Sequence, residues 1–277
     1  KSQYPRAGAS CCRCALMKLL IYQIDAFSNA LFGGNPAAVC PLDKWLPDDV
    51  MQNLAAENNL SETAFFVPSG KTSYELRWFT PTSEVDLCGH ATLASSYLIF
   101  EKLNTSLNVI LFETKSGPLN VSRRGDLIEL DFPARPGTAI ALPVGFEAAH
   151  DCVPSEFLRA AKNLAVFDTQ ASVKSFLPDL SYIKGLGGDG LIITALGDTC
   201  DFVSRYFAPH QGIDEDPVTG SAHCTSVPYW AERLGKSKLH ARQISKRSGD
   251  LFCELAGDRV KIAGRAVLYM EGHIYLP

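Results

Sequence analysis

The feature that most restricts the fold of this chain of 277 residues is an internal duplication. Residues 77–81 (RWFTP) recur as residues 205–209 (RYFAP), an offset of 128. Residues 88–91 (CGHA) recur as residues 219–222 (TGSA), an offset of 131. Ordered matches at a nearly constant offset indicate two copies of one structural unit. We therefore predict two similar domains with a cleft between them, a place where ligands commonly bind.

The domain boundaries follow from the first methionine and from the offset. Residues 1–16 precede Met17 and lack the apolar core of a signal peptide, so we expect them to be a tag or a non-native leader. The offset then predicts an N-terminal domain at 17–132 and a C-terminal domain at 133–264. Residues 265–277 are expected to pack back on the N-terminal domain.

Apolar periodicity and turn residues predict that each copy is an α+β unit. Residues 89–103 are expected to form a helix, and its small side chains suggest burial inside a surrounding sheet. Pro228 lies in the corresponding helix from Gly220 and should kink it or displace its start. The other predicted elements are strands at 19–27, 37–41, 63–67, 74–79, 190–196 and 201–207, a helix at 47–58, and hairpins at 109–132 and 251–263.

Composition excludes several classes of protein. A hydrophobic content of 46% with 20% charged residues is typical of a chain with a packed core. The formal net charge of -4 argues against a nucleic-acid partner, and no apolar run approaches the ~20 residues of a membrane span. After Met17 the cysteines are scattered without a C-x-x-C pair or histidines at ligand spacing. This pattern predicts a cytoplasmic protein with free thiols and no metal site.

One candidate catalytic residue stands where the two copies differ. Glu62 precedes an apolar strand, and its counterpart at offset 128 is Gly190. A carboxylate in such a place is poorly solvated, so its pKa would rise toward a value suited to proton transfer. The alternative is an ordinary capping or edge-strand acid, and the local sequence by itself favours that alternative.

Two predicted helices begin with a glycine, Gly89 and Gly220, and their N-termini suggest a binding site for an anion. Asp216 belongs to an acidic cluster just before Gly220, and neighbouring carboxylates raise one another's pKa. His90 lies at the other helix start, where the helix dipole favours a neutral imidazole. Two such starts facing one cleft would hold a small carboxylate substrate through free N–H groups. Two ordinary capped helices explain the pattern equally well.

Four ordered motifs, extending from near Met17 to the C-terminal domain, resemble the signature of the PhzF family, the phenazine-biosynthesis-like isomerases. The resemblance implies a diaminopimelate-epimerase-like α+β fold, in which two similar domains each wrap a curved mixed sheet round a central helix. It also implies an active site between the domains, a homodimer, and no metal or organic cofactor. The motifs are residues 32–39 (FGGNPAAV), 61–63 (SET), 88–92 (CGHAT) and 215–222 (EDPVTGSA).

The resemblance also implies roles for individual residues. Glu62 matches the family's acid/base, which moves a proton between substrate carbons, and this overrides the local reading of Glu62 as a capping acid. His90 and Asp216 match the groups that assist the transfer. The expected substrate-binding residues are Asn35, Gly89, Gly220 and Ser221.

Two other functions remain open. Epimerases on this fold use a cysteine at each helix start, and Cys88 fits the first position. The second position is Thr219, whose hydroxyl cannot replace a thiolate, so a two-thiol epimerase is disfavoured. A non-catalytic interaction protein on the same scaffold is the third possibility. The region 133–184 looks short for the family, so the phenazine precursor cannot be assumed as the substrate.

Overall fold

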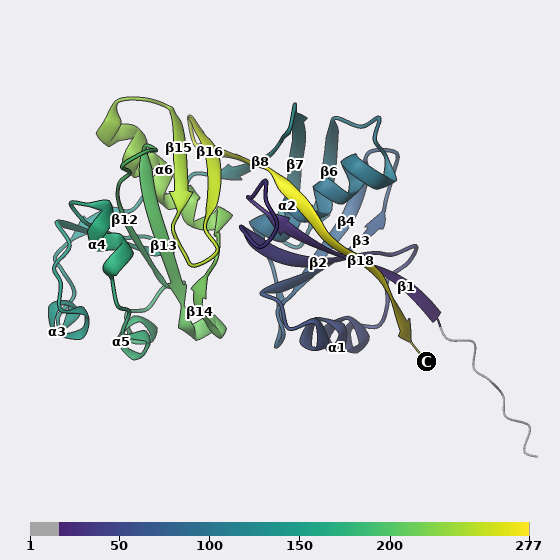
Figure 1. Cartoon of the computed structure of the whole chain (residues 1–277), viewed down its shortest axis with the longest axis horizontal. Helices are drawn as coiled ribbons and strands as arrows, with labels where there is room; N and C mark the ends of the chain where they lie inside the picture. The colour runs from purple at the N-terminus through teal and green to yellow at the C-terminus, as the bar shows by residue number, and fades with distance from the viewer. Residues whose placement is uncertain (1–16, 277) are drawn as a thin grey trace, which may run out of the picture.

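The computed structural model describes residues 17–276, so the expectation about residues 1–16 lies outside the described range. The described chain forms two α+β halves side by side (Figure 1). Each half contains a curved mixed sheet and a central helix, as the duplication predicts. Among residues 17–276, no helix combines the length and apolar character needed to cross a bilayer.

The first half is a sheet wound round helix α2 (Gly89–Leu98). Its strands are β1 (Met17–Ala26), β2 (Asn35–Pro41), β3 (Glu62–Pro68), β4 (Ser73–Phe79), β6 (Val109–Thr114), β7 (Gly117–Arg124), β8 (Leu127–Pro133) and β18 (Ala266–Leu276). They neighbour one another in the order β18, β1, β2, β3, β4, β6, β7, β8. The β2–β3 and β4–β6 pairs are parallel and the others antiparallel. The hairpin expected at 109–132 is therefore a three-stranded meander.

The second half repeats this topology round helix α6 (Gly220–Leu234). Its strands are β9 (Thr138–Ile140), β10 (Glu156–Arg159), β11 (Asn163–Val166), β12 (Leu191–Leu196), β13 (Phe202–Ala208), β15 (Lys238–Gln243), β16 (Gly249–Ala256) and β17 (Arg259–Gly264). They neighbour one another in that same order. The β11–β12 and β13–β15 pairs are parallel. Each strand of the second half thus has a counterpart in the first.

The halves share strands in two ways. Strand β8 pairs antiparallel with β17, which joins the two sheets at the centre of the molecule. The chain then leaves β8 for β9 in the second half, while the last strand, β18, returns to pair with β1 in the first. Each half therefore receives one edge strand from the end of the other (Figure 1).

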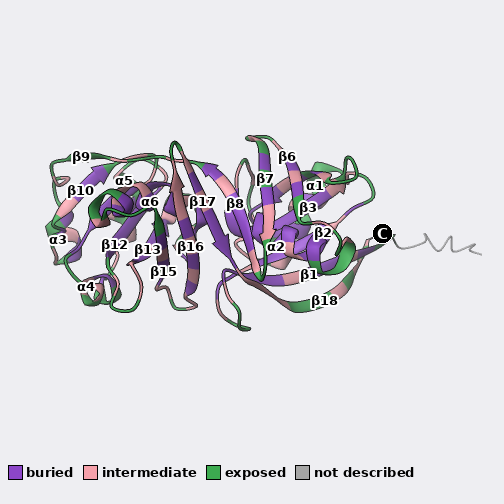
Figure 2. Ribbon diagram, turned by 90° about the horizontal axis from the view of Figure 1, so that it is seen from above, coloured by how far each residue is buried: buried purple, intermediate pink, exposed green. Residues whose placement is uncertain are grey.

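The central helices are buried inside their sheets (Figure 2). In α2 only Tyr97 escapes burial, since alanine and serine side chains let the strands approach closely. Hydroxyl groups of Ser95 and Ser96 donate to main-chain carbonyls one turn earlier, so these polar groups are satisfied. The helix predicted at 89–103 has the expected extent, but it is α-helical only to Leu98 and continues as a wider π-helical turn over Ile99–Leu103.

Pro228 lies inside α6 without displacing the start of the helix at Gly220, so that part of our expectation is wrong. A proline has no N–H to donate to the carbonyl four residues earlier, which here belongs to Cys224. The main-chain N–H of Arg135 donates to Cys224 O instead, at 2.8 Å. Because Pro228 leaves the Cys224 carbonyl free, this carbonyl can bind the segment that follows β8 to the central helix of the second half.

Other helices pack on the outer faces of the sheets. Helix α1 (Asp48–Asn58) packs on β3 and β4, where Met51 and Leu54 join the buried rings of Phe65 and Phe79. In the second half, α3 (Phe146–His150), α4 (Gln170–Ser175) and α5 (Leu180–Gly185) surround a cluster of apolar side chains. These outer layers leave the junction of the halves uncovered by helices.

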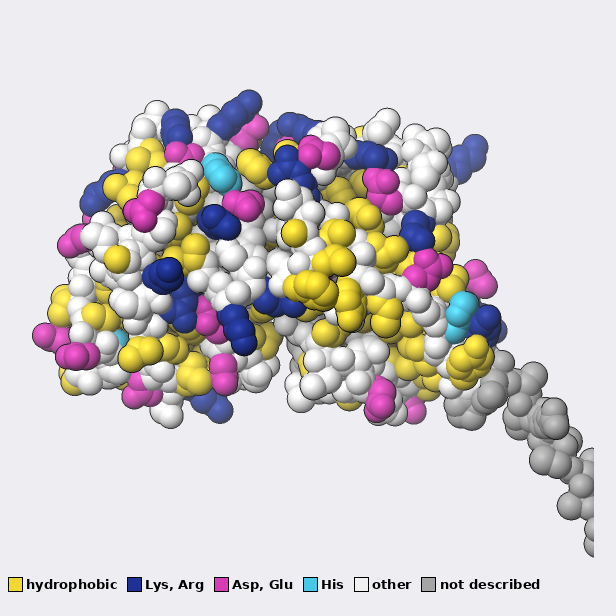
Figure 3. Space-filling model, viewed as in Figure 1, with side chains coloured by type: hydrophobic (Ala, Val, Ile, Leu, Met, Phe, Trp, Pro, Cys, Tyr) yellow, Lys and Arg dark blue, Asp and Glu magenta, His cyan; other side chains and the backbone are white. Residues whose placement is uncertain are grey.

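An apolar patch lies on the surface of the first half, at the β1–β2 connection and on β18 (Figure 3). It comprises Leu31, Phe32, Tyr269 and Met270, all exposed. The ring of Phe32 is 69% exposed and stands edge-on to Tyr269, with 5.9 Å between ring centroids. Contiguous exposed apolar side chains of this kind commonly mark interaction surfaces.

Candidate active site

The first turns of α2 and α6 meet at the junction of the halves. A Cβ atom on Gly89 would lie 3.4 Å from the Cα of Gly220, and one on Gly220 would lie 3.5 Å from the Cα of Gly89, so the two first turns lie within direct contact distance of each other. Neither helix start has a side-chain cap. The free N–H groups of two first turns therefore lie together, an arrangement that binds anions.

These helix starts line a cleft of about 430 Å³ between the halves. Most of the residues that the sequence predicted for the site line this cleft: Glu62, His90, Asp216, Gly89, Gly220 and Ser221. Asn35 is fully buried and does not line the cleft, but its side chain contacts two residues that do. The predicted residues thus occupy one continuous site.

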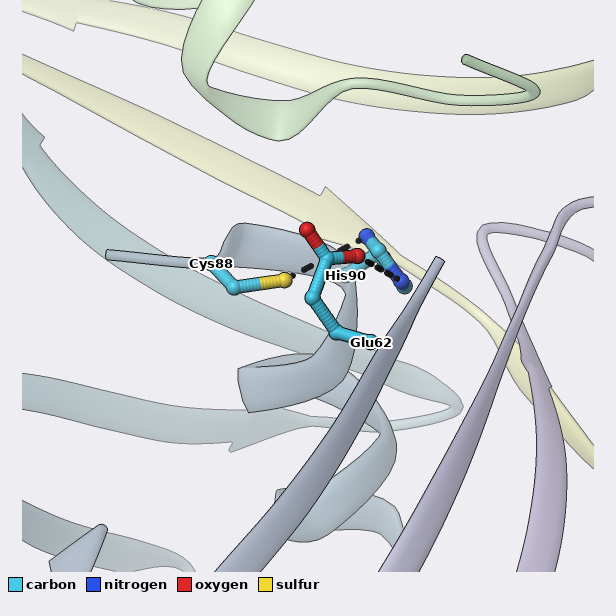
Figure 4. Close-up of side chains that lie close together, drawn as sticks. All are labelled: Glu62, Cys88 and His90. Atoms are coloured by element: carbon cyan, nitrogen blue, oxygen red, sulfur yellow. Dashed lines mark hydrogen bonds and ion pairs between the residues drawn. The ribbon is translucent and has the colours of Figure 1, made fainter. Parts of the chain in front are cut away.

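Glu62, at the first residue of β3, faces His90 in the first turn of α2 (Figure 4). His90 Nε2 lies 3.2 Å from Glu62 Oε2, close enough for an ion pair but without the alignment of a hydrogen bond. Both atoms are buried and have no hydrogen-bond partner among the described residues. Unpaired buried polar atoms are rare in folded proteins, and these two face each other at the cleft.

Of these two groups, Glu62 is the one that changes its charge near neutral pH, whereas His90 stays a neutral imidazole. Burial raises the pKa of Glu62 well above its usual range, and the charge of Asp216 raises it further, while a hydrogen bond from Cys88 opposes the shift. Burial lowers the pKa of His90 to about 3, so its imidazole is neutral. Near neutral pH, Glu62 can therefore both release and accept a proton.

Asn35 fixes the positions of His90 and Asp216. Its Nδ2 donates to Asp216 Oδ1 at 2.8 Å and to the carbonyl of Val218 at 2.9 Å, and lies 3.2 Å from His90 Nδ1. Because Nδ2 is a donor, we assign Nδ1 of His90 as the unprotonated nitrogen, which puts the ring proton on Nε2, facing Glu62.

Asp216 is buried and held by two hydrogen bonds. Besides the Asn35 amide, the hydroxyl of Thr219 donates to Asp216 Oδ2 at 2.5 Å. Burial raises the pKa of Asp216, while these hydrogen bonds and the charge of Lys162 oppose the rise. Glu215, its neighbour in the acidic cluster, points away and makes a bidentate pair with Arg205. Burial, rather than the acidic cluster, is the main cause of the shift.

The second half has no room for a counterpart of Glu62. Gly190 has a φ of +123°, and a Cβ there would lie 2.3 Å from the carbonyl oxygen of Phe207. The ring of Tyr206 fills the adjacent space. Of the two equivalent positions at the starts of β3 and β12, only the one in the first half therefore carries a carboxylate.

Glu62, Cys88 and His90 also offer three potential metal-ligand atoms within 4.8 Å of one another. Cys88 Sγ lies 3.5 Å from His90 Nδ1 (Figure 4). Burial and the nearby Glu62 raise the pKa of the Cys88 thiol well above its usual value. The thiolate that a metal ion prefers is thus disfavoured, and the donor set fits proton transfer better than metal binding.

The cleft also contains residues that the sequence did not predict, among them Arg135, Lys162 and Tyr206. They lie in or after the region 133–184, where the internal repeat is weakest. One signal was available for Lys162, because it precedes Asn163, the counterpart of Asn35 at offset 128.

A family model described as a phenazine biosynthesis-like protein matches residues 24–272. The chain belongs to the PhzC-PhzF family. An uncharacterised isomerase of Pseudomonas aeruginosa is 49% identical over 260 residues, which cover 94% of this chain and 100% of the relative. The crystal structure of a PhzF-family protein from Enterococcus faecalis is 46% identical with a TM-score of 0.91, covering 94% of this chain and all of that one.

The wider fold family extends beyond these PhzF relatives. A hydroxyproline epimerase from Agrobacterium vitis superposes with a TM-score of 0.61 over 94% of this chain and 93% of its own, at 12% identity. At that identity the likeness concerns the fold alone. The expected fold, a duplicated α+β architecture of the epimerase type, is confirmed.

Proposed function

We propose that this PhzF-family protein is a cofactor-independent isomerase that moves a proton between carbons of a small carboxylate or amino-acid-like substrate. One observation carries the proposal: Glu62, with its raised pKa, faces the unpaired Nε2–H of a neutral His90 beside two helix starts. That combination provides a proton carrier, a hydrogen-bond donor and an anion site within one cleft.

In the proposed reaction, N–H groups of the two first turns bind the substrate carboxylate. Glu62 in its carboxylate form removes a proton from a carbon next to an existing C=C bond of the substrate. The electron pair of the broken C–H bond forms a new C=C bond, while the π electrons of the old C=C bond move to its far carbon. The protonated Glu62 then returns the proton to a different carbon. His90 Nε2–H and Asp216 orient the substrate, and the transfer is suprafacial because Glu62 alone, from one side of the cleft, removes and returns the proton.

The test is the substitution Glu62→Gln, which keeps the size of the side chain and removes the proton carrier. A panel of small unsaturated carboxylates and amino acids is incubated in D₂O with each protein, and deuterium incorporation is followed by NMR. We expect the variant to fold normally and to lose roughly 10²–10⁴-fold of the exchange rate. Exchange at the wild-type rate would contradict the proposed role of Glu62.

Cys88→Ser is the matched variant for the alternative, an epimerase that uses Cys88. Its thiol has a raised pKa, and the corresponding position in the second half is Thr219 rather than a second cysteine. We therefore expect Cys88→Ser to keep most of the exchange activity. Loss of exchange in Cys88→Ser with retention in Glu62→Gln would favour the epimerase.

The remaining alternative is a non-catalytic interaction protein. A chain that neither exchanges nor binds any compound of the panel would favour this alternative.

We also propose that the chain forms a homodimer through the apolar patch of Leu31, Phe32, Tyr269 and Met270. The exposure of the Phe32 ring beside an edge strand supports this assignment. We expect light scattering after size exclusion to give twice the mass of the chain for the wild type. Phe32→Ser with Met270→Ser should shift the mass toward the monomer, whereas Leu177→Ser, at an exposed leucine elsewhere, should not. A monomeric wild type would refute the assignment.

We place the protein in the cytoplasm. All six cysteines among the described residues are free thiols, which is usual in a reducing compartment. Fractionation of cells that express the tagged chain would test this location.

A further inference from the structure

The wall of the cleft formed by the second half carries two cations, Arg135 and Lys162. Lys162 immediately precedes β11, and its side chain is only 12% exposed. Its ammonium group lies 5.3 Å from the centre of the Tyr206 ring. Among the described residues its one carboxylate partner is Asp189, at 3.6 Å, and that carboxylate is 47% exposed. A largely buried lysine is thus only weakly neutralised.

Arg135 is an exposed residue that lines the same cleft, and its main chain is tied to α6. Its N–H donates to the Cys224 carbonyl that Pro228 leaves free, which fixes the start of its side chain against α6. Within residues 17–276 the guanidinium makes no ion pair, whereas Arg77 and Arg205, at other places in the sheets, each have a bidentate glutamate. Arg135 is therefore a cation at the cleft without a protein counterion.

The two cations act on each other through the cleft. The charge of Arg135 lowers the pKa of Lys162, in the same direction as the larger effect of burial, while Asp189 opposes both. Like charges held close together cost free energy unless an anion lies near them. A negatively charged ligand in the cleft would remove this repulsion and form charge-assisted hydrogen bonds.

The helix starts already provide for one carboxylate in the proposed reaction. A substrate with that group alone would leave Arg135 without a counterion and Lys162 with only its longer contact to Asp189 in the same cleft. A substrate with two anionic groups would use both places and be oriented from both ends. The carbons between the two anionic groups would then lie next to the carboxyl group of Glu62.

We propose that Arg135 and Lys162 form a second anion subsite and that the substrate is a small dicarboxylate. The inference rests on the proposed function, because it assumes that the first carboxylate binds at the helix starts. Both residues are positioning residues in this assignment, since they bind a group remote from the reacting carbons.

The experiment compares dicarboxylates from succinate to pimelate with the monocarboxylates of equal length, by isothermal titration. We expect at least one dicarboxylate to bind the wild type about tenfold or more tightly than its matched monocarboxylate. Lys162→Met and Arg135→Gln should each reduce this preference, and the double variant should abolish it. Lys162→Arg should keep it. Lys184→Met, at an exposed lysine outside the cleft, is the control and should leave it unchanged.

Two outcomes would overturn the inference: no dicarboxylate preference in the wild type, or a preference that survives in the double variant. Loss of fold cannot mimic the expected result, because the binding of the monocarboxylates reports an intact cleft. The proposed function is judged separately, by deuterium exchange. Glu62→Gln should abolish exchange and retain the dicarboxylate preference. A preference without wild-type exchange would refute the isomerase and leave the subsite standing.

Discussion

Glu62 begins β3 in the first half, whereas Gly190 occupies the equivalent position before β12 in the second. His90 corresponds to Ser221 in the same way, and the buried carboxylate of Asp216 belongs to the second half only. A nearly symmetric frame thus carries an asymmetric set of side chains. One proton carrier and one fixed carboxylate are what a shift of a proton along one face of a substrate requires.

The charge of Asp216 should be visible in the pH profile of the reaction. Glu62 acts first as a base, so kcat/KM should rise with pH as its carboxyl group loses a proton, and this pKa is raised by burial and by Asp216. Asp216→Asn removes the repulsion, so the rising limb should move to lower pH. Rates measured across the pH range for both proteins test this shift. An unmoved limb would show that the two carboxyls do not interact.

Sequence reasoning located the chemistry of the cleft but only part of its wall. Glu62 and Asp216 could be found because they stand where the repeat or a motif is clear. Asn35 could be placed in the site by its motif. It does not line the cleft, and its side chain orients His90 and Asp216 from the buried side. Arg135 has no counterpart in a clear repeat, and Lys162 is indicated only by its place before Asn163, so it is the packing of the halves that shows both at the cleft.

Among the secondary-structure elements, the paired strands β12 and β13 support the wall of the cleft on the side of the second half. The strands themselves are apolar, and the sequence predicted both within a residue or two of their ends. The predictions failed where a side chain or a main-chain group found a partner outside its own element. Pro228 is tolerated in α6 because Arg135 takes over the free carbonyl, which is a contact between distant segments.

Gly190→Ala should destabilise the protein by at least about 2 kcal/mol, because its φ is +123° and the new Cβ would press on the Phe207 carbonyl. Gly187→Ala is the matched control. It also has a positive φ, +75°, but no atom lies within 4 Å of its Cβ position, so we expect a loss of about 1 kcal/mol. Urea unfolding of both variants measures the difference. Equal losses would mean that β13 moves aside freely.

For the whole molecule, the exchange of edge strands couples the stability of the halves. Strand β18 completes the sheet of the first half but follows β17 of the second, and β9 does the reverse. The β8–β17 pair then makes the two sheets continuous. Neither half can lose its structure without exposing strand edges and apolar surface of the other.

We therefore expect the halves to unfold together. Pulse-labelling hydrogen exchange with mass spectrometry, applied at increasing urea concentrations, follows peptides from β3 and from β12 in one sample. Both should become labelled at the same urea midpoint. Two separated midpoints would show that the halves are independent folding units joined only by a connection.

The crossing of β9 and β18 also bears on the ancestry of the chain. A half-length polypeptide with this topology would carry its final strand away from its own sheet, and could close that sheet only with the same strand from a second copy. An ancestor of half the length would thus have been a strand-swapped dimer with two identical acids or none. In a single chain, by contrast, each half can differ from the other, and here the first carries Glu62 where the second carries Gly190.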